Sequence, residues 1–294
     1  MAGIAAEKGG WQQEAEDVVR GMTGGLLIGT PLIYTSEVWT LGATIPPLQV
    51  LLLLVVAYAL NLGCVVWAGF RQGAGGGAHH FSDALETTAL AIVSAGLLLV
   101  VLYRIRLGDP LGIGVGRIVV AAIPISLGIA IANHLISRND SRTEEESDGE
   151  GAQQSSTSLA NVPPRTLLEL GATAAGALFF CFNIAPTEEV RRLATELPEL
   201  YLPALILFTL LVTYGIVFVA DFTGQSRRRA SSGLLQHPAT ETAVAYLVSL
   251  VVGAGTLWLF GQIGPGTDWE LIYAEVIVIG LPAAIGGAAG RLAV

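Results

Sequence analysis

The feature that most constrains this chain is a series of eight long apolar stretches separated by polar segments. The apolar core of a bilayer is about 30 Å thick, so a helix needs roughly 20 apolar residues to cross it. All eight stretches reach that length. The sequence therefore predicts an all-α polytopic membrane protein with about eight transmembrane helices, over residues 20–42, 48–70, 83–104, 113–136, 166–187, 200–222, 239–262 and 270–293.

The charge content agrees with a membrane protein and excludes several functions. Charged residues make up 13% of the chain, about half of the ~25% usual in soluble domains. With 15 Lys and Arg against 24 Asp and Glu, the chain lacks the basic surface that nucleic acid requires. The acidic excess and the single lysine, Lys8, are typical of adaptation to high salt; a GC-rich genome, which favours Arg over Lys, is the alternative. No catalytic, cofactor or metal-ligand motif is present, so we expect neither an enzyme nor a cofactor.

One long polar segment divides the chain. Residues 138–165 are rich in Glu, Ser and Thr and end in a Pro-Pro pair, a composition that cannot bury a core. We predict a disordered acidic linker there, with a membrane unit on each side at 20–137 and 166–294. Residues 1–19 are predicted to be a polar tail.

The two membrane units align with each other. Glu86-Thr87 matches Glu241-Thr242 at an offset of 155 residues, and Pro124 matches Pro282 at an offset of 158. We therefore predict a duplicated four-helix unit, with chance similarity among apolar helices as the alternative. An even number of helices in each unit makes the two repeats parallel in the membrane.

The basic residues set the expected orientation. With the N-terminus inside, ten Lys and Arg lie in inner segments and five in outer ones. Because positive residues concentrate on the cytoplasmic side, we predict a multi-pass protein of the plasma membrane with both termini and the linker in the cytoplasm.

Small residues and prolines indicate how the helices pack. Glycines spaced four apart allow close backbone approach between membrane helices. A proline inside a helix removes a hydrogen-bond donor and kinks the helix, and the freed carbonyl then needs a polar partner. The predicted packing glycines are Gly21, Gly25, Gly29, Gly286 and Gly290, and the predicted kinks are Pro124 and Pro282.

Five ionisable residues fall near one depth, close to the predicted outer ends of their spans. They are Glu37, Glu188, Glu189, Arg117 and Glu275, with Glu37 matching Glu188 at an offset of 151 and Arg117 matching Glu275 at 158. Ionisable groups at membrane depth are costly and usually functional. We predict that they converge as an ion or proton site in which Arg117 pairs with a carboxylate. The alternative is that each reaches headgroup water on its own.

Glu86 and Glu241 form a second matched pair near the predicted inner ends of their spans. They are candidates for the inner mouth of the same path. Acidic residues in a first helical turn also complement the helix dipole, and that simpler role is the alternative.

Several strings resemble those of one family. They are Thr35–Trp39, Phe182–Glu189 and the Gly-Leu-Pro-Ala-Ala-Ile-Gly stretch from Gly280 to Gly286. On them the chain resembles an uncharacterised family of prokaryotic integral membrane proteins, classed as a domain of unknown function. The resemblance implies a polytopic membrane protein without an established activity, and it carries over no site residues.

Two functions remain open on the sequence. The first is a cation or proton transporter or channel that uses the paired membrane carboxylates, with the lipid bilayer and small cations or protons as its partners. The second is a non-transporting membrane module that binds a partner or lipid. An intramembrane enzyme is the least supported, because no catalytic signature is present. The sequence does not predict an oligomeric state.

Overall fold

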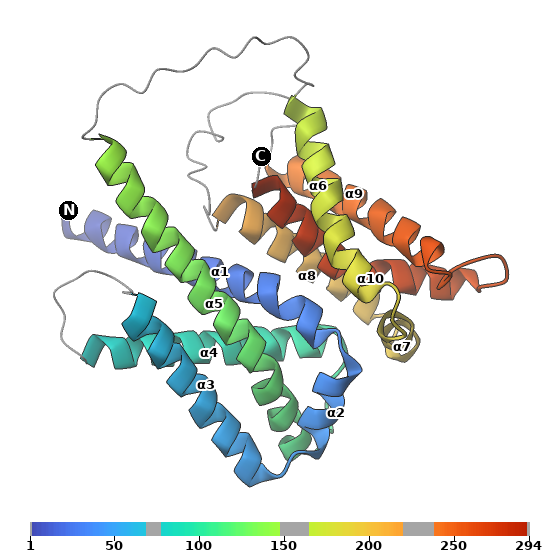
Figure 1. Ribbon diagram of the computed structural model, residues 1–294, viewed down its shortest axis with the longest axis horizontal. Helices are drawn as coiled ribbons and strands as arrows, with labels where there is room; N and C mark the ends of the chain where they lie inside the picture. The colour runs from blue at the N-terminus through green and yellow to red at the C-terminus, as the bar shows by residue number, and fades with distance from the viewer. Residues whose placement is uncertain (1, 69–77, 148–164, 220–237, 293–294) are drawn as a thin grey trace.

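The computed structural model describes residues 2–68, 78–147, 165–219 and 238–292, and the elements in these ranges are helical. Figure 1 shows the first half of the chain, from blue to green, beside the second half, from yellow to red. The helices of the first half are α1 (Ala2–Ile33), α2 (Ser36–Thr44), α3 (Pro47–Ala68), α4 (Ala78–Val101) and α5 (Leu111–Ser147). Those of the second half are α6 (Arg165–Ile184), α7 (Glu189–Glu196), α8 (Tyr201–Tyr214) with the π-helix η1 (Gly215–Val219), α9 (Pro238–Leu259) and α10 (Trp269–Leu292).

Each half is organised around its last helix. α5 packs against α1, α2, α3 and α4, and α10 packs against α6, α7, α8 and α9. Both halves follow one order, in which a long helix and a short helix precede three further helices. The halves meet where α1 touches α10, α6 and η1, and where α4 touches α8.

The prediction of eight spans is not confirmed. Among the described residues, five helices are long and apolar enough to cross a membrane, and α6 with α7 makes a sixth only if this pair, bent by 88°, counts as one span. The five are His80–Val101, Leu111–Ala132, Tyr201–Phe218, Pro238–Leu259 and Trp269–Arg291. The part of the chain that the structure describes is thus all-helical, with five or six candidate spans by length and composition.

The difference arises at turns that hydropathy does not detect. The stretch predicted as 20–42 breaks at Tyr34-Thr35, so α1 ends at Ile33 and α2 starts again at Ser36. The stretch predicted as 166–187 likewise ends with α6 at Ile184, before Pro186. In α3 the part whose side chains the structure describes, Pro47–Gly63, is apolar but too short to count as a span. Helix boundaries depend on local backbone bonds as well as on apolar length.

Two segments predicted to lack structure are helical where the structure describes them. α1 begins at Ala2, inside the predicted tail, and α5 continues to Ser147, inside the predicted linker. The first segment is rich in Ala and Glu, and the second contains Glu and Arg. These residues propagate a helix well once a neighbouring stretch has formed it. Residues 148–164 of the linker lie outside the described residues.

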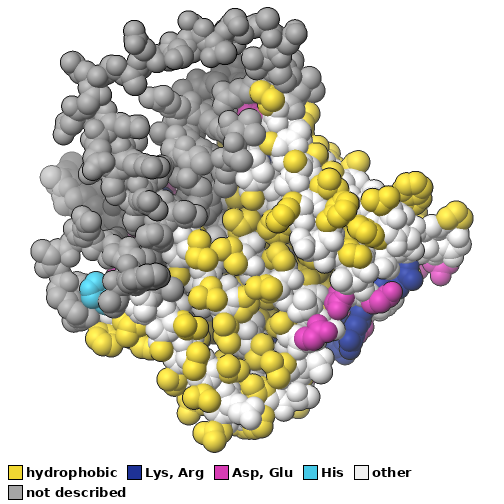
Figure 2. All heavy atoms as spheres, viewed as in Figure 1, with side chains coloured by type: hydrophobic (Ala, Val, Ile, Leu, Met, Phe, Trp, Pro, Cys, Tyr) yellow, Lys and Arg dark blue, Asp and Glu magenta, His cyan; other side chains and the backbone are white. Residues whose placement is uncertain are grey.

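The described surface suits a lipid environment. Figure 2 shows hydrophobic side chains spread over the visible face, with acidic and basic side chains gathered along one edge. Large exposed apolar side chains include Leu52, Val55, Phe179 and Val251. A soluble protein rarely exposes so continuous an apolar surface, whereas lipid tails solvate it.

The glycines predicted to pack lie at helix contacts. A Cβ on Gly25 would come 2.7 Å from Ile125 Cγ2, and one on Gly21 would come 2.6 Å from Leu90 Cδ2. A Cβ on Gly29 would lie 2.5 Å from Ile125 Cγ1. In the second half, Gly286 and Gly290 lie against the backbone carbonyls of Gly176 and Ala172. Both α1 on α5 and α6 on α10 therefore approach to backbone contact.

A Cys-labelling experiment tests the orientation. Leu107, in the loop between α4 and α5, is fully exposed, and Glu14 on α1 is exposed at the predicted cytoplasmic end. In intact cells an impermeant maleimide should label Leu107→Cys, and it should label Glu14→Cys only after permeabilisation. The parent chain, which carries Cys64 and Cys181, is the background. Labelling in the reverse order would invert the topology.

A matched pair of glycines on α6 tests the close packing. A Cβ on Gly176 would collide with Gly286 O, whereas Gly171 has no atom within 4 Å of that position. Gly176→Ala should lower the free energy of unfolding in detergent by about 1–3 kcal/mol through overpacking. Gly171→Ala should keep or raise it, because alanine favours helix more than glycine does. Equal effects would refute backbone contact between α6 and α10.

Candidate functional site

Two loops at the same edge of the molecule share one conformation. In the α4–α5 loop the amides of Arg104 and Ile105 both donate to Leu99 O, at 2.8 and 3.3 Å. In the α9–α10 loop the amides of Gln262 and Ile263 donate to Leu257 O, at 2.9 and 3.4 Å. Positive φ angles recur at the same offset of 158, at Tyr103 (56°) and Gly261 (74°) and at Gly108 (109°) and Gly266 (102°).

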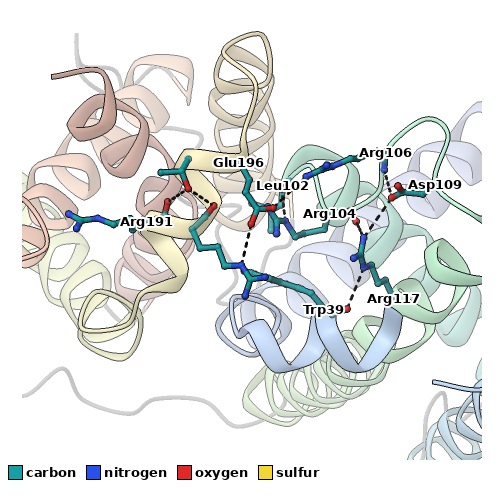
Figure 3. A network of polar contacts seen from close by, with 10 residues as sticks. Trp39, Leu102, Arg104, Arg106, Asp109, Arg117, Arg191 and Glu196 are labelled. Atoms are coloured by element: carbon teal, nitrogen blue, oxygen red, sulfur yellow. Dashed lines mark hydrogen bonds and ion pairs between the residues drawn. The ribbon is translucent and has the colours of Figure 1, made fainter. Parts of the chain in front are cut away.

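Arg117 braces the first of these loops from α5. Its guanidinium donates to Arg104 O and, at 3.4 Å, to Trp39 O, and it lies 3.7 Å from Asp109 Oδ2 (Figure 3). Gly42 makes room, because a Cβ there would lie 2.6 Å from Arg117 Cα. The arginine therefore joins α2, α5 and the loop on one side of the first half.

The second loop is braced by another arrangement. Its matching position on α10 is Glu275, whose Oε1 accepts a hydrogen bond from Arg191 Nε of α7 at 2.8 Å. Arg191 also donates to Gln262 O, the counterpart of Arg104 O. A guanidinium thus donates to the equivalent carbonyl in each loop. In the first half the guanidinium comes from α5, and in the second half it comes from α7. Glu275 holds the second guanidinium in place.

Glu275 is the most buried acidic group described. Its exposed fraction is 0%, and its second oxygen, Oε2, has no hydrogen-bond partner among the described residues. A buried carboxylate oxygen without a partner is costly in free energy. Such a group is therefore a candidate functional site.

The predicted pairing of Arg117 is wrong. Arg117 pairs with Asp109, whereas the partner of Glu275 is Arg191. Glu37 and Glu188 are exposed, each beside the turn that breaks a predicted straight span. Those turns move both carboxylates toward the surface, away from the depth that an unbroken helix would give them.

Glu189 lies where the two short helices face each other. It is half-buried and accepts a hydrogen bond from Ser36 Oγ at 3.3 Å. Ser36 and Glu189 are the first residues of α2 and α7. This contact joins the two halves at the charged edge.

A second link between the halves is made by Arg104, which sequence reasoning missed. Its side chain is 6% exposed, lies 3.0 Å from Glu196 of α7 and stacks 4.7 Å from the ring centroid of Trp39 (Figure 3). Burial lowers the pKa of the Arg104 guanidinium, and Glu196 opposes that shift. Arg106 and Arg192 also reach Glu196, at 3.4 and 3.2 Å. Only the loop conformation brings Arg104 to this position, and no motif marks it.

The two residues of the predicted inner pair, Glu86 and Glu241, have different surroundings in the structure. Glu241 forms an ion pair with the buried Arg291 of α10, which also lies 3.3 Å from Glu169 of α6. Glu86, its sequence match, is exposed on α4. Among the described residues, the buried ion-pair cluster at this end therefore belongs to the second half.

The carbonyl freed by Pro282 has the polar partner that the sequence requires. Proline cannot donate to the carbonyl four residues earlier, which is Val278 O. Tyr34, just after α1, donates its hydroxyl proton to that carbonyl at 2.7 Å. Pro124 lies inside α5 at the matching position.

The described residues contain no group of three or more His, Cys, Asp or Glu placed to hold a metal ion. Three polar features instead lie along α10. Glu275 lies near one end of α10, the Val278 carbonyl follows it, and Arg291 lies at the other end.

Sequence comparison assigns the chain to a family. The profile described as "Putative integral membrane protein (DUF2391)" matches residues 17–294. The chain belongs to this family. It is thus an integral membrane protein of a family without an assigned function, in agreement with the resemblance seen in its sequence. Searches of the curated proteins and of the solved structures give no match.

The ion pair between Arg191 and Glu275 can be tested by removing the arginine and then, in a double variant, also neutralising the glutamate. Arg191→Met leaves the buried Glu275 without a cation and should lower the free energy of unfolding by about 3 kcal/mol, the lower end for a broken buried pair because Arg191 is partly exposed. Adding Glu275→Gln should recover most of the loss, as followed by denaturation in detergent. The neighbouring Arg192→Met, at an exposed pair, should cost under about 1 kcal/mol. No recovery in the double variant would contradict the pairing.

Proposed function

We propose that this protein moves protons or small cations across the membrane through its second half, with Glu275 as the group that exchanges the ion. The observation that carries the proposal is the complete burial of Glu275 together with the unpartnered Oε2. Arg191 satisfies only one carboxylate oxygen. The other oxygen can accept a proton or a cation, and either would relieve the cost of the bare group.

The position of Glu275 supports transport over a purely structural role. It lies on α10, which packs against every other helix of its half. Binding of a proton at Glu275 weakens its attraction for Arg191, because the ion pair loses its negative partner. Arg191 also holds the loop carbonyl of Gln262. Ion binding is thereby coupled to the loop that closes the end of α10.

The opposite end of α10 carries a second group of polar residues, formed around the buried Arg291. Arg291 is buried between Glu241 and Glu169, and burial of an arginine among acids in a membrane protein is typical of ion paths. We place this cluster at the cytoplasmic end, with both termini in the cytoplasm of a plasma-membrane protein.

The two halves fit a duplicated unit in this proposal. The shared order of helices, the matched loops and the prolines at one offset all support a duplication. In that scheme α1 and α3 complete the first half as α6 and α8 complete the second, which restores eight membrane-embedded segments. α2 and α7 then lie at the membrane surface.

The competing function is a non-transporting membrane module. The observation that favours it is the network at the charged edge, where Arg104, Arg106 and Arg192 all converge on Glu196. Such a network makes a rigid platform suited to holding a partner. In this reading Glu275 only fixes Arg191.

Reconstitution in proteoliposomes tests transport. We expect flux driven by a pH gradient or by a Na⁺ or K⁺ gradient in wild-type vesicles, and Glu275→Gln should reduce it at least tenfold, because an amide cannot exchange a proton or bear the charge. Glu270→Gln, at an exposed position in the first turn of the same helix, is the matched control and should retain flux. Wild-type flux equal to that of empty vesicles would leave the membrane module as the function.

A further inference from the structure

Two tyrosine hydroxyls approach the turn of α10 that precedes Pro282. Tyr34, just after α1 in the first half, donates to Val278 O at 2.7 Å and is buried. Tyr246, from α9, approaches the same turn, because a Cβ on Gly280 would lie 3.5 Å from its hydroxyl oxygen. The absence of a side chain at Gly280 is what lets Tyr246 reach α10.

The Tyr246 hydroxyl has no partner among the described residues, although the residue is only 6% exposed. Buried tyrosine hydroxyls almost always have a hydrogen-bond partner. Because this hydroxyl lies in the interior of a membrane protein, bulk water cannot supply the missing bond. A bound water molecule is the partner that fits such a place.

Thr30 adds a third hydroxyl close to Tyr34 along α1. Its side chain is fully buried, and its Oγ1 also has no partner among the described residues. The hydroxyls of other buried threonines donate to the backbone carbonyl four residues earlier, as those of Thr209 and Thr213 do. Thr30 lies one turn before Tyr34, so both hydroxyls project from neighbouring turns of one helix.

We propose that Tyr34, Tyr246 and Thr30 line a hydrated site beside Val278 and Gly280 of α10 that relays protons, and that the proton is the ion carried. This inference rests on the proposed function, in which Glu275 exchanges the ion. The three hydroxyls and the Val278 carbonyl are all neutral groups. A hydroxyl can accept one proton while it donates another, whereas a metal cation dehydrated here would find no carboxylate among these groups.

The relay step conserves atoms and charge. A protonated water beside Tyr246 gives a proton to the phenol oxygen as the phenol O–H bond breaks toward the next oxygen acceptor. Tyr246 therefore ends neutral, as it began, and the positive charge has moved on by one oxygen. The proposed site lies between Glu275 and the Arg291 cluster in the order of α10.

The test combines flux with a direct probe of water. Tyr246→Phe removes only the hydroxyl and should keep the fold, because no hydrogen bond to another described residue is lost. In proteoliposomes it should reduce proton flux at least tenfold. Tyr273→Phe, which alters a half-exposed tyrosine on α10, is the control and should leave flux unchanged. Thr30→Val should reduce flux in the same direction.

Hydroxyl-radical footprinting of the detergent-solubilised protein gives the second readout. Radiolysis of bound water should label Tyr246 and Tyr34 despite their burial, and Thr30→Val should weaken that labelling. Full flux in Tyr246→Phe, or no labelling of Tyr246, would overturn the relay. If Glu275→Gln abolishes flux while Tyr246→Phe does not, only the relay fails. If Glu275→Gln retains flux, the proposed function itself fails, and a flux of Na⁺ or K⁺ without protons refutes the proton as the ion.

Discussion

Direct backbone contact at small residues is the interaction on which both halves depend. In lipid, apolar side chains give no hydrophobic gain on helix association, so close packing has to hold the helices together. Gly128 lies against Gly24 O in the first half, and Gly176 lies against Gly286 O in the second. These contacts fix α5 on α1 and α10 on α6. The remaining helices of each half then pack on α5 or α10.

The sequence predicted the features that follow from local chemistry. Glycine spacing located the packing contacts, and Pro282 indicated a freed carbonyl that needs a partner. The identity of that partner, Tyr34, depends on how the two halves meet, and no local pattern contains that information. The turn at Tyr34-Thr35 was missed because apolar length alone does not define a helix end. The pairing of Arg117 was missed for a related reason, since Asp109 becomes its partner only through the conformation of the α4–α5 loop.

The matched positions Arg117 and Glu275 solve one structural problem in two ways. Both loops leave a carbonyl, Arg104 O or Gln262 O, that receives a guanidinium. In the first half the arginine stands on α5 itself. In the second half it comes from α7, and a carboxylate on α10 holds it. A structural requirement that one arginine can meet does not explain why the second half keeps a fully buried acid. That asymmetry is the strongest reason to look for ion chemistry on α10.

The links between the halves restrict how transport can occur. Arg104 and Glu196 join them at the charged edge, Ser36 and Glu189 join the two short helices, and Tyr34 reaches Val278 O in the interior. A rocking motion of one half against the other would break all three links, and the freed Val278 carbonyl would then lie in an apolar medium at high cost. Transfer along fixed hydroxyl groups requires only rotation of O–H bonds and small shifts of side chains. For the proposed transport, the geometry of the interface therefore favours proton transfer while the two halves keep their relative position. Alternating access, in which the halves would move against each other, is disfavoured.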